Sequence, residues 1–436
     1  MSKRLVFLVA ALAGGACRAD DLAAYVTAPD PSYAWRIERR SEVPGGKAVV
    51  VELTSQTWRG NVWKHWVTIV EPATVDYPDA ALLVVNGGQN GRPAPALDGP
   101  GAAYLAAIAG RMRCLVVVLS QIPNQPLLEA RGEDALIAHT FDRYLVSGEK
   151  DWPLLFPMTK SAVRAMDLVQ GLAPEELGRK IERFCVTGGS KRGWTTWLVA
   201  ACDRRVAAIA PMVIDTLNLS EQTRHQIRSW GAFSPEVHDY TELELQRRMD
   251  EDPRGPGLVE SVDPYARRGS IGMPKLILLG TNDPYWPVDS ARFYFDDLVG
   301  ESYLHYVPNA GHGLDPTAAE AVAGFFRTVL AGRPRPRVAW RTTQGAEAAT
   351  LVVVCSDEPV ACRLWSASSH SRDFREAKWS DRAVAPDERG AYVVRVSRPD
   401  ASGDHEAFFA EFDYPADGGG TYSVCTRVEV LPGGVQ

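Results

Sequence analysis

The fold of this chain is decided by the stretch Phe184-Cys185-Val186-Thr187-Gly188-Gly189-Ser190-Lys191-Arg192-Gly193-Trp194. Its first four residues are apolar and predict a buried strand, and residues 194–202 predict a helix that follows directly. A strand, a Gly-x-Ser turn and a helix form the layout of a nucleophile elbow. In that layout a serine hydroxyl is exposed at the carboxyl end of a central strand.

Two glycines in this stretch have a physical reason to be there. Gly188 lies two residues before Ser190 and Gly193 lies three residues after it, where strand and helix approach so closely that a Cβ would clash. The usual motif also has a glycine two residues after the serine, where this chain has Arg192. The alternative to a nucleophile elbow is a strand-to-helix turn with an incidental serine. The remaining sequence discriminates between these two interpretations.

Composition excludes several classes of protein. The chain has 436 residues, of which 45% are hydrophobic and 23% are charged, as in ordinary globular proteins. This length predicts two or three domains. The formal net charge is −7 and no long basic run is present, so nucleic acid and anionic membrane surfaces are not expected as partners.

The first residues have the pattern of a secretory signal peptide. Lys3 and Arg4 precede a short apolar core at residues 5–13, and small residues continue to Ala19. This core is too short for a transmembrane anchor. We therefore expect a signal peptide over residues 1–19 and a periplasmic or secreted protein. Lipidation at Cys17 and a cytosolic N-terminal helix are the alternatives.

Continuous apolar runs predict strands that are buried on both faces of a parallel sheet. They lie at residues 80–85, 113–119, 184–187, 206–214, 275–280 and 302–307. Helical patterns alternate with them at residues 102–110, 133–146, 160–172, 194–202 and 317–330. This alternation predicts an α/β-hydrolase fold over residues 20–332, with a mostly parallel sheet and helices on both faces. Residues 48–53 and 66–70 predict antiparallel strands that lead into the sheet, and residues 216–272 predict a helical cap insertion.

A change of pattern marks a second domain. The Arg- and Pro-rich residues 333–337 read as a linker, and alternating strands separated by turn residues follow. These strands, at residues 350–354, 391–396, 407–412 and 421–430, predict a C-terminal β-sandwich over residues 337–436. Cys355, Cys362 and Cys425 can supply one disulfide, whose pairing stays open. No C-x-x-C pair is present and the histidines are scattered, so neither a metal site nor a cofactor is predicted.

The loops after the later strands supply partners for the serine. A serine hydroxyl becomes nucleophilic when a base takes its proton and an acid orients that base. Asp283 follows the strand at residues 275–280, and His312 follows the strand at residues 302–307. The order Ser190, Asp283, His312 is the order of an α/β-hydrolase triad. Asp215 is an alternative acid, and Asp289 more simply caps the helix that follows it.

An oxyanion hole requires two N–H donors where negative charge develops. The residue after the nucleophile supplies one, which predicts the Lys191 amide. The glycine-containing loop after residues 80–85 predicts the second at Gly88 or Gln89, with a plain tight turn as the alternative.

Several side chains are candidates for binding the substrate. Lys191 and Arg192 can hold an anionic group, and the alternative is an ion pair with Glu133 or Asp134. Large aromatic and histidine side chains can line a pocket, although buried aromatic residues are commonly core. These candidates are Trp58, His65 and Trp194, together with Trp63 and Trp230.

Several motifs together resemble one known family. They are Ser55-Gln56-Thr57-Trp58, Trp63-Lys64-His65, Asn86-Gly87-Gly88, residues 121–126, Glu133-Asp134, residues 157–160, residues 164–167, Gly189-Ser190-Lys191-Arg192-Gly193-Trp194, residues 213–218, Asp263-Pro264-Tyr265 and residues 308–312. From about residue 25 to the tail, the chain resembles the PhoPQ-activated pathogenicity-related family, which includes secreted eukaryotic proteins of the autocrine proliferation repressor A type.

The resemblance implies an exported α/β-hydrolase-like protein with a C-terminal β-domain. The family is linked with bacterial virulence, and a dipeptidyl-peptidase-like role has been suggested for its eukaryotic branch. The residues around Ser190 are also locally similar to glucuronoyl esterases, which carry a basic residue after the serine. One departure is Asn282, because the family commonly shows glycine before the acid.

The sequence therefore predicts an exported serine hydrolase that forms an acyl-enzyme with a peptide or a small ester. A hydrolase-fold binding or signalling protein without turnover is one alternative. A carbohydrate (uronate) esterase, in which Lys191 or Arg192 holds the uronate carboxylate, is another. The oligomeric state stays open.

Overall fold

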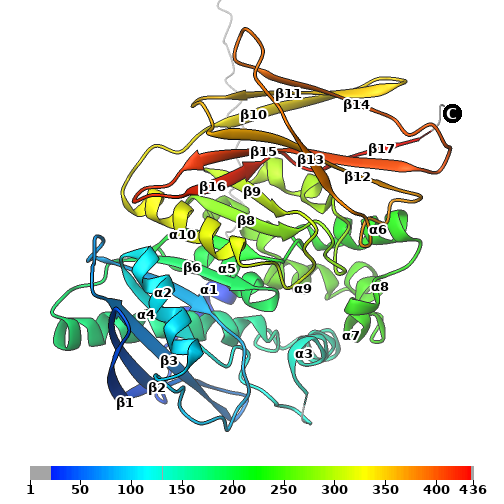
Figure 1. Ribbon diagram of the computed structural model, residues 1–436. Helices are drawn as coiled ribbons and strands as arrows, with labels where there is room; N and C mark the ends of the chain where they lie inside the picture. Colours follow the sequence, from blue (N-terminus) through cyan, green and yellow to red (C-terminus); the bar gives the residue numbers. More distant parts are fainter. Residues whose placement is uncertain (1–20, 130, 434–436) are drawn as a thin grey trace, which may run out of the picture.

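The structure, a computed structural model, describes residues 21–129 and 131–433 (Figure 1). The predicted signal peptide and Cys17 lie outside these residues, so their assignment stays a prediction. None of the helices in the described segments is long and apolar enough to cross a membrane.

A parallel sheet forms the centre of the molecule. Its strands run in the spatial order β5-β4-β6-β7-β8-β9, and every neighbouring pair is parallel. Their bounds are β4 (Ala80–Val85), β5 (Leu115–Leu119), β6 (Arg183–Gly189), β7 (Val206–Met212), β8 (Lys275–Gly280) and β9 (Ser302–Val307). Each strand corresponds to one of the predicted apolar runs.

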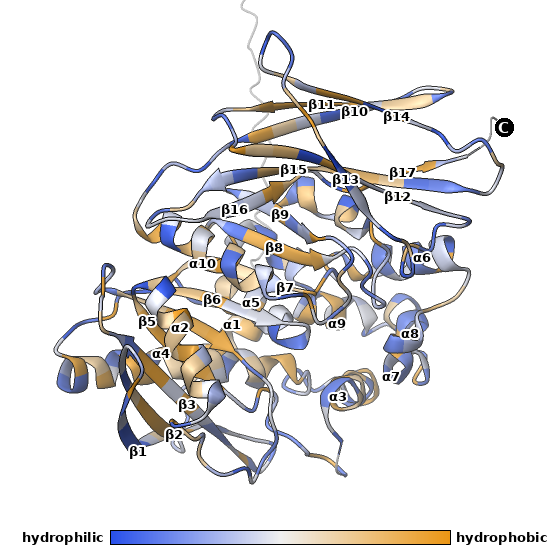
Figure 2. Ribbon diagram, in the orientation of Figure 1, coloured by the Kyte–Doolittle hydropathy of each residue, from blue (hydrophilic) through white to orange (hydrophobic). Residues whose placement is uncertain are grey.

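Both faces of this sheet are buried, which explains why its strands are apolar throughout. On β4, Ala81 and Leu83 join one hydrophobic core, whereas Leu82 joins the core on the opposite face. Successive side chains of a strand point to opposite faces, so a strand covered on both sides requires an apolar residue at every position. Figure 2 shows hydrophobic residues concentrated along β2, β3 and β8.

An antiparallel extension precedes the parallel strands. It consists of β1 (Ala34–Val43), β2 (Gly46–Trp58) and β3 (Asn61–Pro72). β3 pairs with β5 in antiparallel orientation and joins the extension to the central sheet. The predicted antiparallel strands are confirmed, and they are longer than the apolar runs that predicted them.

Helices cover both faces of the sheet. α2 (Pro100–Met112) and α10 (Thr317–Leu330) contribute to one core, and α1 (Asp21–Thr27), α3 (Glu133–Ser147), α4 (Leu155–Leu177) and α5 (Lys191–Cys202) contribute to the other. Between β7 and β8 the chain forms the predicted helical insertion. Its members are α6 (Leu219–Trp230), η1 (Pro235–Val237), α7 (His238–Thr241), α8 (Leu245–Glu251), α9 (Gly255–Val262) and η2 (Pro264–Ser270). Two short helices, η3 (Ser290–Phe293) and η4 (Phe295–Asp297), follow β8.

The C-terminal part consists of two antiparallel layers (Figure 1). One layer contains β12 (Ala361–Ser369), β13 (Ser380–Ala383), β15 (His405–Pro415), β16 (Thr421–Cys425) and β17 (Glu429–Pro432). The other contains β10 (Val338–Gln344), β11 (Ala348–Cys355) and β14 (Tyr392–Ser397). Tyr392 and Phe412 pack edge to face between the layers, with ring centroids 5.2 Å apart, as in a β-sandwich.

Two details differ from the sequence-based expectations. The single strand expected at residues 421–430 is divided into β16 and β17. The two strands pair with different parts of β15, residues 411–415 and residues 405–408. β16 also pairs with β9 at Cys425 and Leu304, so this layer continues the central sheet. The division of the chain into domains near residues 332–337 therefore stays a prediction.

The cysteines in the described residues are free thiols. The disulfide expected among Cys355, Cys362 and Cys425 is not formed in this structure. Cys425 is fully buried in the layer that continues the central sheet, where burial raises the pKa of its thiol well above the ordinary value.

Candidate active site

Ser190 lies on a sharp turn between β6 and α5. Its backbone dihedral angles are φ 57° and ψ −126°, which are strained for a residue with a side chain. The Ser190 amide donates to the Met212 carbonyl at 2.8 Å, and the Ser190 carbonyl accepts from the Trp194 amide at 3.0 Å. This geometry presents the hydroxyl at the carboxyl edge of the sheet.

The two glycines of the elbow are required by close contacts. A Cβ on Gly188 would lie 2.7 Å from the Arg192 carbonyl oxygen. A Cβ on Gly193 would lie 2.8 Å from the Met212 carbonyl oxygen and 2.7 Å from Ile214. The predicted reason for these glycines is confirmed.

Ser190, His312 and Asp283 form a continuous hydrogen-bonded chain. His312 Nε2 lies 2.9 Å from Ser190 Oγ, and His312 Nδ1 lies 2.9 Å and 3.1 Å from the two Asp283 carboxylate oxygens. The Asp283 side chain is 6% exposed and the His312 side chain is 25% exposed. The acid is thus shielded from water, while the imidazole remains accessible to a ligand.

The loop after β8 fixes the acid and the base together. The Asp283 carboxylate accepts a hydrogen bond from the Tyr285 amide at 2.9 Å, and the Tyr285 ring stacks against His312 with centroids 4.1 Å apart. Because β8 and β9 are parallel neighbours, the loops that carry Asp283 and His312 end at the same edge.

Asp215, the alternative acid, is buried beneath this site. No described residue donates a hydrogen bond to its Oδ1, and His312 pairs with Asp283 instead. Burial, with smaller contributions from the charges of Asp283 and Asp289, raises the pKa of Asp215 to about 7 although Tyr294 opposes the shift. The structure therefore does not bring Asp215 to the imidazole.

The loop after β4 lies beside the elbow, because β4 and β6 are parallel neighbours. Gly88 has φ +138°, which a side chain rarely adopts, and its carbonyl accepts from Gln125 Nε2 at 3.0 Å. Within the described chain, the amides of Gly88 and Gln89 donate to no protein acceptor. The Lys191 amide belongs to the first turn of α5, where helical N–H groups have no partner in the helix.

The two basic residues after Ser190 are held by acids. Arg192 binds Glu133 through both terminal nitrogens, at 2.7 and 2.9 Å, and its Nε donates to the Ile122 carbonyl. Lys191 Nζ lies 2.8 Å from Asp134 Oδ2 and 3.3 Å from Glu133 Oε2. The ion-pair alternative is therefore confirmed for both residues.

Electrostatics stabilise this arrangement. Burial alone would raise the pKa of Glu133, but the hydrogen bonds and charge of Arg192, with Gln125 and Lys191, lower that pKa to about 2. A Cβ on Gly87 would lie 2.6 Å from Arg192 Nη2, so the guanidinium packs directly against the loop that carries Gly88. Arg192 thus supports the loop beside the elbow.

A small cavity of about 80 Å³ lies over Ser190. Trp194, Tyr240 and Trp286 contribute to its apolar walls, and Lys191 contributes a cation that is already paired. The Trp194 indole N–H donates to the Val262 carbonyl at 2.6 Å, which fixes that wall to the cap.

Trp58 and His65 do not lie in this cavity. The Trp58 indole N–H donates to the Asp151 carbonyl at 2.9 Å, and Trp58 packs against Trp63 and Trp152. His65 Nε2 lies 2.9 Å from Ser55 Oγ, and burial lowers the pKa of this histidine to about 4. Both side chains belong to the core around β2 and β3.

The sequence interpretation missed the contribution of the C-terminal part. The Asn282 side-chain amide donates to the carbonyls of Phe374, Arg375 and Ala377 at 3.2, 3.0 and 2.7 Å. Asn282 directly precedes Asp283, so the segment between β12 and β13 holds the acid loop. The one sequence signal was the asparagine that departs from the family pattern.

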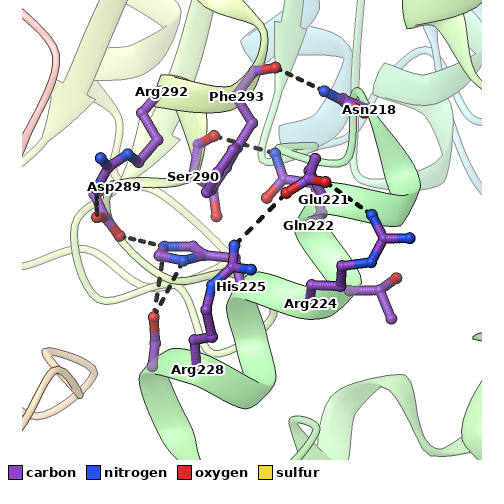
Figure 3. A network of polar contacts seen from close by, with 12 residues as sticks. Asn218, Glu221, Gln222, Arg224, His225, Arg228, Asp289, Ser290, Arg292 and Phe293 are labelled. Carbon is purple, nitrogen blue, oxygen red and sulfur yellow. Dashed lines mark hydrogen bonds and ion pairs between the residues drawn. The ribbon is translucent and has the colours of Figure 1, made fainter.

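Residues of the cap, on and next to α6, contact the segment that follows β8, as Figure 3 shows. His225 on α6 lies 2.6 Å from Asp289, and Asp289 also pairs with Arg372 of the C-terminal part at 2.6 Å. Burial opposes ionisation, but the hydrogen bond and charge of His225, with Arg372 and Arg292, keep the pKa of Asp289 below its ordinary value. Asp289 thus connects three parts of the chain.

No group of three or more His, Cys, Asp or Glu side chains in residues 21–129 and 131–433 could hold a metal ion.

The fold and the site define an α/β-hydrolase-fold protein. The serine elbow follows β6, the acid follows β8 and the histidine follows β9, in the chain order of this class. The family model described as PhoPQ-activated pathogenicity-related protein matches residues 22–375. The chain belongs to this family.

Two kinds of relative accompany the family match. Autocrine proliferation repressor protein A from Dictyostelium discoideum is 31% identical over 455 residues, covering 95% of this chain and 90% of that protein. An acetyl xylan esterase from Paenibacillus sp. R4 is a similar solved structure, with 15% identity, a TM-score of 0.49, and coverage of 72% and 92%. A glucuronoyl esterase from Solibacter usitatus has 12% identity, a TM-score of 0.43, and coverage of 71% and 91%.

Proposed function

We propose that this protein is a serine hydrolase that acts on ester or peptide carbonyl groups. The observation that carries the proposal is the chain from Ser190 Oγ through His312 to Asp283, with hydrogen bonds of 2.9 Å on both sides of the imidazole. These distances are within the range for a general base and its nucleophile.

In the proposed reaction, His312 Nε2 takes the Ser190 hydroxyl proton while Oγ attacks the substrate carbonyl carbon. The resulting oxyanion accepts hydrogen bonds from the Lys191 amide and from Gly88 or Gln89. His312 then gives the proton to the leaving alcohol or amine, the carbon–heteroatom bond breaks, and an acyl-enzyme remains. Water, deprotonated by His312, attacks this ester, the bond from the acyl carbon to Ser190 Oγ breaks, and His312 returns the proton to Oγ as the acid leaves. Asp283 holds Nδ1–H and stabilises the imidazolium throughout.

The pairing of Lys191 and Arg192 favours this general hydrolase over a uronate esterase. Both cations already bind carboxylates of the protein, so neither is available to a substrate carboxylate without breaking an ion pair. A binding protein without turnover would not require a strained serine in hydrogen-bond contact with a buried His–Asp pair.

An alkyl fluorophosphonate probe tests the proposal. We expect it to label the wild-type protein and to leave Ser190→Ala unlabelled, with Ser41→Ala on β1 as the control that keeps full labelling. Equal labelling of Ser190→Ala, or no labelling of folded wild type, would overturn the assignment.

We further propose that residues 1–19 direct export, as their charge and apolar pattern indicates. Expression of the full chain with a C-terminal tag, followed by fractionation and N-terminal sequencing, should recover a processed protein outside the cytoplasm. Recovery of an intact Met1 terminus from the cytoplasm would contradict export.

A further inference from the structure

A second cavity lies on the α2/α10 side of the central sheet. It has a volume of about 610 Å³, much larger than the cavity over Ser190, and the two share His312 and Val213 as walls. This volume is within the range of small-molecule binding sites. The His312 imidazole, which contacts Ser190, therefore forms part of the wall of both cavities.

Residues of α2 and α10 form one wall of this cavity. Gly101 and Ala102 of α2, and Ala318, Ala319 and Ala323 of α10, line it. Protein interiors are normally close-packed, with few voids larger than a water molecule. Space remains between the helices and the sheet beside these short side chains, and larger apolar residues of the same helices, among them Leu105, Ile108 and Val322, line the rest of the cavity.

The cavity is polar at one end and apolar at the other. Asn86, Ser120 and Thr187 line it at or near the carboxyl edge of the sheet, whereas Leu82 and Met112 line its deeper part. Along β4 and the residue that follows it, the lining residues Leu82, Val84 and Asn86 alternate and span about 13 Å at the usual strand rise. The space is therefore elongated and runs inward from the site.

The scarcity of charged side chains around the cavity disfavours an ionic ligand. Among the described residues that line it, Asp315 is the one carboxylate and none is a lysine or an arginine. The Asp315 carboxylate is already bound by the Thr317 amide at 2.8 Å and by the Thr317 hydroxyl. Tyr104, 58% exposed, adds an apolar ring on the solvent side.

We propose that this cavity binds an uncharged aliphatic chain of the substrate, which extends from the carbonyl at Ser190 along the sheet beneath α2 and α10. The proposal rests on the proposed hydrolase function and specifies its substrate class. The chain belongs either to the acyl group or to the alcohol of the ester, since both groups lie beside His312 during the reaction.

Two series of esters test the proposal and distinguish these sources. In p-nitrophenyl alkanoates from acetate to decanoate the acyl chain grows, and in alkyl acetates from methyl to decyl the alcohol grows. We expect kcat/KM to rise about two- to fourfold per added methylene in one series, up to a limiting length. A flat response in both series would overturn the proposal.

A cavity-filling variant with a matched control locates the chain. Ala102 is 6% exposed and lines the cavity, whereas its neighbour Ala103 is exposed. We expect Ala102→Phe to abolish the chain-length dependence while hydrolysis of the acetate is retained, and Ala103→Phe to behave as wild type. An equal loss for short and long esters would count against the cavity. Ala323→Phe, on α10, serves if Ala102→Phe does not fold.

A binding measurement separates this proposal from the function on which it rests. Calorimetry should detect binding of 1-octanol to Ser190→Ala, weakened at least tenfold by adding Ala102→Phe and unchanged by adding Ala103→Phe. If octanol binds in this way but no ester is cleaved, the hydrolase function fails and the cavity assignment stands. If esters are cleaved without chain-length dependence and octanol does not bind, the cavity assignment fails alone.

Discussion

Asn309 and Trp379 exchange two hydrogen bonds. The Asn309 side-chain amide donates to the Trp379 carbonyl at 3.1 Å, and the Trp379 amide donates to Asn309 Oδ1 at 2.8 Å. Asn309 lies three residues before His312, and Trp379 lies in the C-terminal part. The loop that carries His312 is therefore held by the C-terminal part, which is distant in the sequence. The loop that carries Asp283 is held by the same part of the chain through Asn282.

This contact predicts a catalytic cost when it is removed. We expect Asn309→Ala to lower kcat about 10- to 100-fold with little change in KM, because a small misplacement of the imidazole disrupts proton transfer without altering substrate contacts. Steady-state kinetics on a short p-nitrophenyl ester measure the effect. Asn61→Ala, at the first residue of β3, is the control, and an unchanged kcat for Asn309→Ala would contradict the positioning role.

The fork geometry of Arg192 makes a second prediction. Lysine keeps the charge but cannot bind Glu133 through two nitrogens while a third donor reaches the Ile122 carbonyl. We expect Arg192→Lys to slow fluorophosphonate labelling about tenfold, because the loop carrying Gly88 and Gln89 loses its support. Arg36→Lys, whose side chain is 62% exposed, should label at the wild-type rate. Unchanged labelling of Arg192→Lys would show that the loop is held by other contacts.

The elbow makes a prediction about stability. Gly193→Ala places a Cβ within 3 Å of Ile214 and of the Met212 carbonyl, so we expect a loss of about 1–3 kcal/mol in the free energy of unfolding. Urea denaturation measures it. Gly269→Ala is the matched control, because nothing lies within 4 Å of its added Cβ. Equal stability of the two variants would mean that the elbow relaxes without cost.

The buried Asp215 carboxyl predicts a pH dependence of stability. Its folded-state pKa of about 7 lies above the ordinary value of 3.8, chiefly because of burial. Between about pH 4 and pH 7 the unfolded chain therefore releases a proton that the folded protein keeps, so this group destabilises the fold increasingly as the pH rises.

Asp215→Asn removes that dependence. Relative to wild type, we expect the variant to gain on the order of 2–4 kcal/mol in unfolding free energy between about pH 4 and pH 8. Urea denaturation at several pH values measures the difference, and the exposed Asp98→Asn is the control. A difference between Asp215→Asn and wild type that stays constant with pH would contradict the raised pKa.

The sequence was sufficient for the parts of the site that depend on local pattern. Apolar runs located the parallel strands, and the loops after them supplied Asp283 and His312 because parallel strands end at a common edge. Gly188 and Gly193 were predicted from the steric demands of one turn. These inferences need only the direction of the chain and the spacing of residues.

Other features depend on side chains that meet across long sequence distances. The partner of Arg192 was left open, because the sequence does not show whether an arginine side chain pairs with an acid of the protein or is free to bind a substrate. Trp58 and His65 lie near one another in the sequence as aromatic and polar candidates, yet the long β2–β3 hairpin buries both away from the cavity. The contact between Asn309 and Trp379 joins residues 70 positions apart and leaves no local pattern.

The pairing of β16 with β9 has a consequence for the solubility of the protein. A strand at the edge of a sheet presents unpaired N–H and C=O groups to which another molecule can add a strand. Here Cys425 pairs with Leu304, so β16 is the neighbour of β9 on the side that β8 leaves free. By occupying part of this edge, the C-terminal part protects the central sheet against intermolecular pairing. We expect a fragment that ended before Val338 to expose that edge and to aggregate.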